Sequence, residues 1–319
     1  MTCHNCKTEC RRFGKTRKGQ QRYQCCQCRK TYSEPRNENL GGMYITPDTV
    51  ESIVRLLVEG CSVNSVERIT GVHHTTILKL LVLVGARCER LLESKVRNVR
   101  VKDVQCDEMW GFVGCKEKRN TTGDPERGDA YCFVAFERHS KLVLTWHLGR
   151  RTASDTAVFV EKLNEATKGH FQVTTDGFSA YFDALHTSLG TRTDYAQLIK
   201  VYAGGGTDEE HRYSPPKVIE AVVKPMFGEP DAERICTSHV ERSNLTMRMQ
   251  IRRLTRLTNA FSKKRANLKA ALALYFAWYN FVRVHRTLRV TPAMEAGLAN
   301  HVWTLGELLG SDSQQALAA

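Results

Sequence analysis

Two pairs of cysteines near the start of the chain have the spacing of a structural metal site. Cys3 and Cys6 are separated by two residues, as are Cys25 and Cys28, and eighteen residues lie between the pairs. A pair at this spacing can place both sulfurs on one ion, and two pairs complete the tetrahedron that zinc prefers. Residues 1–35 are therefore predicted to form a zinc ribbon, with one structural Zn²⁺ per chain on these four cysteines.

One ligand of this site stays open at the level of sequence. Cys26 adjoins Cys25, so either can bind the metal, and Cys10 is spare. The alternative is four reduced surface cysteines, which two matched pairs disfavour. A segment this short cannot bury enough apolar surface to fold alone, so metal binding would supply its folding free energy. Tyr23 and Tyr32 are expected to form its small core.

Three acidic residues farther along the chain are candidates for catalysis. Asp107 lies inside a strand-like run, Asp176 ends another, and Glu241 begins a basic helix. Carboxylates that converge repel one another unless cations neutralise them. Mg²⁺ or Mn²⁺ does this with oxygen ligands, and keeps positions open for water and phosphate. Two such ions about 4 Å apart can activate an attacking oxygen and stabilise the leaving one, so we predict two ions on these three residues.

Each acid also has an ordinary structural explanation. Asp176 precedes Gly177, which is a common turn signal, and Glu241 could be a charge that stabilises the start of a helix. Glu108 stands beside Asp107, and adjacent residues of a strand face opposite sides, so only one of them can face the site. Glu108 therefore remains the alternative ligand, and the prediction depends on the joint placement of the three acids.

The helix that begins near Glu241 strengthens this prediction. At about 100° per residue, Asn244, Arg248 and Arg252 fall near the face of Glu241. One face of a long helix would then offer a metal ligand, an amide and two guanidinium groups in a row. We expect Arg248, two turns from Glu241, to meet a phosphate that bridges the metals.

The elements that must position the acids follow one another in an informative order. The hydrophobic pattern predicts three strands, a helix, a strand, a helix and a strand. The strands cover residues 104–113, 130–137, 142–148, 171–175 and 196–201. The helices cover residues 155–166 and a segment opened by Gly177. This is the order of the α/β ribonuclease H-like fold, with a mixed five-stranded sheet. Its first and fourth strands are neighbours, so Asp107 and Asp176 can converge.

Apolar periodicity predicts three helices within residues 45–95. The first begins at Pro47 and stops at Gly60, the second covers residues 63–70, and the third follows Gly71. Short helices around a glycine turn are typical of an all-α helix-turn-helix domain. A plain helical hairpin that packs on the core is the alternative.

The side chains of these helices divide into an inner and an outer set. Val66 and Ile69 of the second helix are expected to face inward. A recognition helix would enter a major groove of DNA. The third helix would then present His73, His74, Thr75, Thr76 and Lys79 to the bases.

Basic residues are concentrated in two blocks. The formal net charge is +13, of which residues 1–30 carry +8 and residues 241–290 carry +11, leaving about −6 for the rest. One-sided charge over fifty residues indicates a polyanion, and double-stranded DNA is the expected partner. The further predicted DNA contacts are Arg11, Arg12, Lys15, Arg17, Lys18, Asn244, Arg252, Arg253 and Arg256.

Composition excludes two broad classes and indicates the domain order. Hydrophobic residues make up 41% and charged residues 25%, which excludes wholesale disorder. The longest apolar run, about ten residues, is too short to span a membrane, and we expect a prokaryotic cytoplasmic protein that associates with the nucleoid.

The predicted domains are 1–35, 45–95, a catalytic domain over 99–290 with a Gly- and Pro-rich insertion at about 203–236, and a tail over 291–319.

Several strings resemble the insertion sequence one family of DDE transposases. They are CDEMWGFVG, YCFVAFERHSKLVLTWHLGRRT, TTDGFSAY and HVERSNLTMRMQIRRLTR. The cysteine ribbon and the helix-turn-helix resemble that family too, and YNFVRVHRTLRVTPAMEAG is similar to a tail shared by several DDE families. The resemblance covers about residues 1–300.

The resemblance implies a function and assigns roles to residues. It makes Asp107, Asp176 and Glu241 the catalytic triad, and Arg248 matches the basic residue seven positions after the glutamate. It implies a homodimer or larger assembly on the terminal inverted repeats of a transposon. Metal-activated water would cleave the ends, and the freed 3′-hydroxyl would be joined to target DNA.

Two alternatives and one departure qualify this expectation. A structure-specific nuclease on the same fold would lack strand transfer, and a domesticated DNA-binding regulator would not need the intact acids. Glu241 follows Asp176 by 65 positions, a longer separation than in many DDE enzymes. The insertion at 203–236 is therefore expected to have a role of its own.

Overall fold

The computed structural model describes residues 1–17, 19–33, 40–202, 218–255 and 258–310. The chain divides into two compact units, residues 1–50 and 51–319, and the boundary falls within helix α1 (Pro47–Val58). Lys18 and Arg256, both predicted to contact DNA, lie outside the described residues, as does the first part of the predicted insertion, 203–217.

The first unit begins with a small antiparallel sheet. Its strands β1 (Cys10–Lys15), β2 (Gln21–Cys25) and β3 (Thr31–Ser33) pair in that order. Cysteines form the buried centre of this unit, and the partly buried Tyr23 and Tyr32 pack against them. The two tyrosines therefore border a core of cysteines and, contrary to the prediction, do not form it by themselves.

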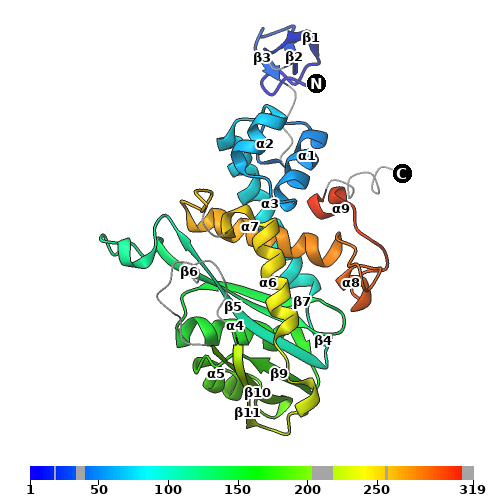
Figure 1. Ribbon diagram of the computed structural model, residues 1–319. Coiled ribbons are helices and arrows are strands. Elements are labelled where there is room, and N and C mark those ends of the chain that lie inside the picture. Colours follow the sequence, from blue (N-terminus) through cyan, green and yellow to red (C-terminus); the bar gives the residue numbers. More distant parts are fainter. Residues whose placement is uncertain (18, 34–39, 203–217, 256–257, 311–319) are drawn as a thin grey trace. The chain divides into compact units, whose positions relative to one another are not determined.

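Three helices follow as predicted: α1, α2 (Val63–Thr70) and α3 (His74–Lys95) (Figure 1). Ser62 caps α2 by accepting a hydrogen bond from the Ser65 N–H, and Gly71 ends it with a left-handed φ of 70°. Val66 is fully buried, but the side chain of Ile69 is exposed, so the prediction that both face inward is wrong. The helix has only two turns, and Ile69 lies in the last one, outside the face that α3 covers.

The second unit contains a mixed six-stranded sheet in the order β11-β10-β9-β5-β6-β7. Strand β5 pairs in parallel with β9 on one side and antiparallel with β6 on the other. The strands are β5 (Asp103–Val113), β6 (Gly128–Glu137), β7 (Val143–Gly149), β9 (Phe171–Thr175), β10 (Thr193–Tyr202) and β11 (Val218–Phe227). The predicted mixed α/β architecture and the contact between the first and fourth strands are confirmed.

The sheet has one strand more than predicted. Strand β11, within the segment predicted as an insertion, pairs antiparallel with β10 at the sheet edge. Its first eight residues are exposed, so it adds an edge to the sheet and contributes little to the core. Pro225 and polar residues in this segment masked the strand pattern, because proline is tolerated only at such edges.

Helices cover both faces of the sheet (Figure 1). On one face α4 (Ala153–Ala166) packs on α5 (Ala180–Ser188), and Phe159 of α4 meets Phe133 of β6 at 5.5 Å between ring centroids. On the other face lie α6 (Ser238–Gln250) and α7 (Arg265–Phe281). The short helices α8 (Pro292–Glu295) and α9 (Leu305–Leu309) also pack against α7.

Among the described residues, no single helix is long and apolar enough to cross a membrane, and α2 with α3 reaches that composition only across a bend of 113°.

Helix α7 connects the helical part of the second unit to its sheet. The side-chain amide of Asn280 makes hydrogen bonds of 2.9 and 3.1 Å with the backbone of Val143 in β7. On its other side α7 crosses α3 at Gly85, where an added Cβ would lie 2.5 Å from the Cα of Ala270. The two helix backbones can approach this closely only because residue 85 has no side chain.

We therefore expect Gly85→Ala to destabilise the protein. In an exposed helix this change stabilises by about 1 kcal/mol, but here the new methyl group would force the α3–α7 crossing apart, and a loss of about 1–3 kcal/mol is expected. Urea unfolding measures the difference. Ala86→Val at the neighbouring exposed position is the control, and a Gly85→Ala protein as stable as the parent would contradict this packing.

Candidate functional site

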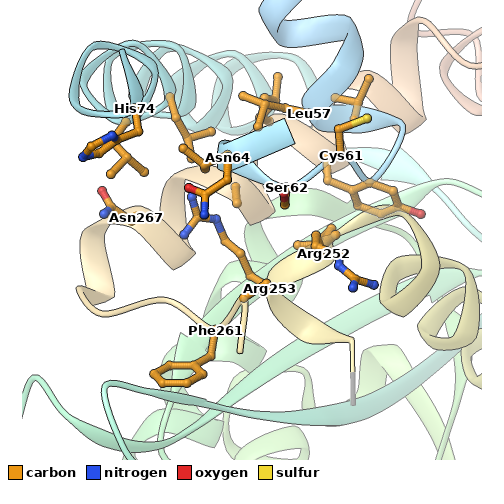
Figure 2. A pocket seen from close by; sticks show the side chains of 18 of the residues that line it. Leu57, Cys61, Ser62, Asn64, His74, Arg252, Arg253, Phe261 and Asn267 are labelled. Carbon is orange, nitrogen blue, oxygen red and sulfur yellow. The ribbon is translucent and has the colours of Figure 1, made fainter. Parts of the chain in front are cut away.

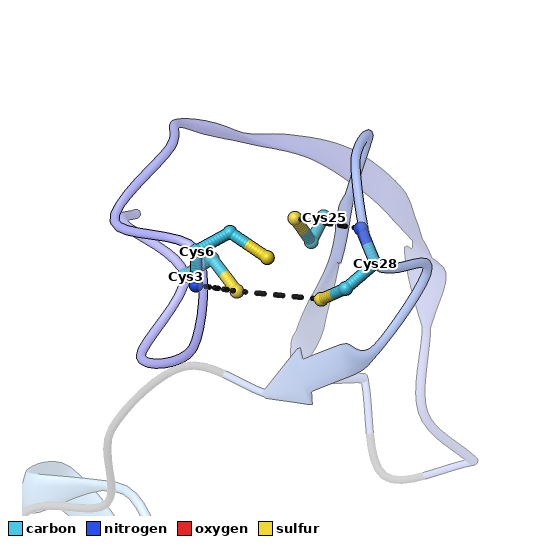
Figure 3. Close-up of side chains that lie close together, drawn as sticks. All are labelled: Cys3, Cys6, Cys25 and Cys28. Carbon is cyan, nitrogen blue, oxygen red and sulfur yellow. Dashed lines mark hydrogen bonds between the residues drawn. The ribbon is translucent and has the colours of Figure 1, made fainter.

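The four predicted zinc ligands lie together in the ribbon (Figure 3). Their sulfur atoms are all within 4.8 Å of one another, and those of Cys3 and Cys28 are 3.6 Å apart. Cys25 is buried, whereas Cys26 is exposed and lies outside the group, so the structure decides between these neighbours. The four-cysteine cluster could hold a zinc ion.

Backbone and hydroxyl donors favour thiolates in this cluster. The N–H groups of Gln27 and Cys28 each donate to the Cys25 sulfur at 3.4 Å. A hydrogen bond from Thr8 first, and then these N–H groups, lower the pKa of the Cys25 thiol to about 6. The pKa of Cys6 is raised to about 12, chiefly by its hydrogen bond with Cys28. Metal binding to this cluster would displace the remaining thiol protons.

The catalytic candidate Asp107 projects from β5 toward α6. Its Oδ2 accepts a hydrogen bond of 2.7 Å from the Asn244 amide, and its Oδ1 accepts one of 2.8 Å from the Glu108 N–H. The start of α6 is fixed to the same strand, since the Gln105 side chain accepts hydrogen bonds from the N–H groups of His239 and Val240. Gln105 and Asp107, two residues apart, thus share the face that α6 covers.

The electrostatic environment of Asp107 is unfavourable for its charge. Burial first, then the negative charge of Asp176, and also that of Glu241, raise the pKa of Asp107 to about 6. Hydrogen bonds from Glu108 and Asn244 oppose the shift only partly. The other two predicted carboxylates thus both disfavour the charged form of Asp107.

Glu108 faces the opposite side of the sheet, as strand alternation requires. Its side chain is almost completely buried and accepts a hydrogen bond of 3.0 Å from Arg151. The buried phenol of Tyr181, on α5, lies beside it, and the charge of Glu108 contributes to raising the pKa of that phenol after burial. Burial and the charge of Asp176 raise the pKa of Glu108 itself to about 7.

Basic side chains hold the other two acids of the predicted triad. Asp176, directly after β9, pairs with Arg151 at 3.4 Å, and Arg151 thereby bridges it to Glu108. Glu241 pairs with Lys200 of β10 and accepts a hydrogen bond of 2.6 Å from Thr237. Among the described residues, the three carboxylates do not form a group within 4.8 Å of one another.

The available donors fit a hard divalent cation. Asp107, Asp176 and Glu241 supply carboxylate oxygens, and the side-chain Oδ1 of Asn244 is buried with no hydrogen-bond partner. Oxygen donors of this kind are the ligands that Mg²⁺ and Mn²⁺ take. Arg151 and Lys200 now supply the positive charge that a metal ion would bring.

The end of α6 differs from the prediction. The helix ends at Gln250, and Arg252 lies in a following 3₁₀ turn, so the prediction that Arg252 shares the helical face of Glu241 is wrong. Two nitrogens of Arg248 donate to the backbone carbonyls of Leu254 and Trp110, at 2.9 and 3.0 Å. These bonds anchor the end of α6 to β5.

The predicted DNA-contacting residues of the ribbon and of α3 lie largely at the surface. Those of the ribbon are exposed: Arg11, Arg12, Lys15 and Arg17. On α3, Thr75 and Lys79 are exposed and Thr76 is partly buried. The ring of His74 is about half exposed and lies 3.1 Å from the carboxylate of Glu67.

Sequence reasoning missed two sets of residues. The first set is Arg151 and Lys200, which contact the candidate carboxylates. Only Arg151 could have been suspected from the sequence, because it closely follows the end of a strand, β7. The second set is Glu67, His73 and His74. Their potential metal-ligand atoms lie within 4.8 Å of one another, although Gly71 stands between Glu67 and the two histidines in the sequence.

No model of a known protein family and no curated protein matches this chain.

We expect freshly purified protein to contain one zinc ion per chain. Cys6→Ser should lose it, because three thiolates leave the tetrahedron incomplete. Cys26→Ser is the matched control and should retain the metal, since its side chain is exposed and outside the cluster. Elemental analysis measures the zinc, and loss of zinc from Cys26→Ser with retention in Cys6→Ser would contradict the assignment.

The raised pKa of Asp107 predicts a pH-dependent stability. An acidic group whose pKa is raised in the folded protein contributes to the free energy of unfolding at pH values below its ordinary pKa. This contribution is lost as the pH rises through the pKa of the folded state. In buffer without divalent cations, Asp107→Asn should match the parent near pH 4 and exceed its unfolding free energy by about 2 kcal/mol at pH 8. Urea unfolding across this range checks it.

The control for this series is Thr187→Ala, a change at an exposed neutral residue of α5. Its stability difference from the parent should stay constant with pH, because no ionisable group is removed. A constant difference for Asp107→Asn as well would show that Asp107 ionises normally.

Proposed function

We propose that this protein is a DNA transposase of the DDE type, with a ribonuclease H-like catalytic domain. One observation carries the proposal: β5, which bears Asp107, pairs in parallel with β9, which Asp176 directly follows, and Asn244 on the helix that bears Glu241 donates a hydrogen bond of 2.7 Å to Asp107. Repelling carboxylates held by a rigid sheet and helix are the arrangement that metal-dependent phosphodiester chemistry needs.

The residues of the chain have distinct tasks in this proposal. Asp107, Asp176 and Glu241 would hold two Mg²⁺ or Mn²⁺ ions, and Asn244 orients Asp107 through its hydrogen bond. Bound ions would supply activation of water and charge stabilisation. Arg151 and Lys200, which contact Asp176 and Glu241, would be placed to contact the phosphates of the DNA.

The DNA-binding parts of the chain deliver the substrate. The exposed basic residues of the ribbon position the phosphate backbone, and α3 reads base edges at the terminal inverted repeats. Cleavage frees a 3′-hydroxyl, which the same site joins to target DNA. Neither step needs a covalent enzyme intermediate, so positioning and electrostatics carry the rate. A homodimer or larger assembly would hold two ends together.

Single replacements of the three acids by alanine test the proposal. Asp107→Ala, Asp176→Ala and Glu241→Ala should each reduce cleavage and strand transfer by at least about 1,000-fold, because one metal-bound site serves both steps. Binding of end DNA should persist, since a carboxylate that repels phosphate is removed. Oligonucleotide cleavage in Mg²⁺ and gel-shift binding are the measurements.

Two further variants sharpen this test. Asp183→Ala, at an exposed acid of α5 away from the site, should keep full activity. Glu108→Gln should retain cleavage, because Glu108 faces α5 and not α6. If Glu108→Gln abolishes cleavage while Asp107→Ala does not, the ligand has been assigned to the wrong face of β5, and if all three alanine variants cut DNA the proposal fails.

A further inference from the structure

A cavity of about 510 Å³ lies among the helix-turn-helix, α7 and the segment after α6, all within the second unit (Figure 2). Its walls include the first turns of three helices. Asn64 belongs to the first turn of α2, Thr75 to that of α3, and Asn267 to that of α7. Apolar side chains, Phe261 among them, complete the lining.

The charged side chains that line this cavity are basic. Arg252, Arg253 and Lys263 line it, and its lining residues include no aspartate or glutamate. Among the described residues, the walls therefore carry three permanent cations and no carboxylate.

Arg253 is the most constrained of these cations. Its Nη1 donates to the Ser262 hydroxyl at 3.0 Å, but its Nη2 is buried and has no hydrogen-bond partner. Burial lowers the pKa of the guanidinium to about 10, and no carboxylate offsets this effect. In Figure 2 the side chain extends toward Asn64 and Asn267.

A buried charge without a partner is expensive, and proteins normally pair it or expose it. Arg253 is half-buried and is not paired with an acid in the described part of the chain, so an anionic ligand in the cavity would offset the cost of burying its charge. A structural role for Arg253 alone would account for its bond to Ser262 but not for the unpartnered nitrogen that faces a basic cavity.

The surrounding helices favour the same kind of ligand. The starts of α2, α3 and α7 carry partial positive charge because their first N–H groups lack partners within the helix. The start of α7 has no side-chain cap. Phosphate matches this set in size, charge and number of acceptor oxygens, and guanidinium groups bind it through paired hydrogen bonds.

We propose that this cavity binds a phosphate group through Arg253, with Lys263 as a further cation of the lining and the amides of Asn64 and Asn267 as further donors. The phosphate group can come from a free anion or from the DNA backbone. In either case it connects the turn of the helix-turn-helix to α7 and to the segment after α6. Binding of the anion stands independently of the transposase proposal, and only the DNA source rests on it.

Titration of the full-length protein with inorganic pyrophosphate tests the site. Pyrophosphate should raise the melting temperature of the parent and bind at a 1:1 ratio in calorimetry, since a ligand of the folded state stabilises it by mass action. Arg253→Gln should weaken binding at least tenfold and gain stability without the anion, because the unpaired buried charge is gone.

Two variants make the result interpretable. Arg90→Gln removes an exposed arginine of α3 outside the cavity and should bind pyrophosphate like the parent. Asn267→Asp places an acid in the cavity wall and should abolish anion binding while the protein remains folded, even if Arg253→Gln fails to fold. Unchanged binding in Arg253→Gln or Asn267→Asp, or an equal loss in Arg90→Gln, would overturn the proposal.

Competition with duplex DNA identifies the source of the phosphate. If a backbone phosphate enters the cavity, DNA displaces pyrophosphate, and Arg253→Gln weakens DNA binding and reduces its salt dependence by about one phosphate contact. If the ligand is a free anion, pyrophosphate and DNA bind together. The Asp107→Ala protein should bind pyrophosphate normally, so failure of the catalytic proposal and failure of this one are distinguishable.

Discussion

The close crossing of α3 and α7 is the constraint on which the rest of the second unit depends. Helix α7 is buried along most of its length, and it meets β7 through Asn280 and α3 through the contact of Ala270 with Gly85. Because backbone meets backbone at Gly85, the helices cannot slide or separate without losing the packing. A second close approach reinforces it, since a Cβ at Gly60 would lie 2.7 Å from the Met249 carbonyl at the end of α6.

This rigidity lets the protein hold charges in unfavourable places. Asp107 is partly buried beside two other acids, and Arg253 is half-buried without an acid to pair with in the described part of the chain. Both arrangements oppose folding unless something of opposite charge arrives, a cation in the first case and an anion in the second. Both arrangements lie within the second compact unit.

Much of the architecture was predictable because local rules determined it. The helix boundaries at Pro47, Gly60 and Gly71 follow from capping and turn chemistry, and the strand that contains Asp107 follows from a strong apolar pattern. Strand β11 was missed because an edge strand buries little and needs no such pattern. The end of α6 was missed because periodicity alone does not show where packing stops a helix.

The candidate site was predictable only in part, for a related reason. Element order placed Asp107 beside Asp176, but pairing of Arg151 and Lys200 with the acids depends on contacts between distant segments. The cavity around Arg253 likewise forms only where three helix starts meet, and no single stretch of sequence encodes it.

The central claim is that Asp107 binds a catalytic metal ion, and a change of ligand atom tests it most directly. Asp107→Cys replaces a hard oxygen by a softer sulfur, which disfavours Mg²⁺ far more than Mn²⁺. The account predicts that this variant fails to cleave end DNA in Mg²⁺ and regains cleavage in Mn²⁺, while the parent is active in both. Equal inactivity of Asp107→Cys in both metals, or equal activity in both, would contradict direct metal binding by Asp107.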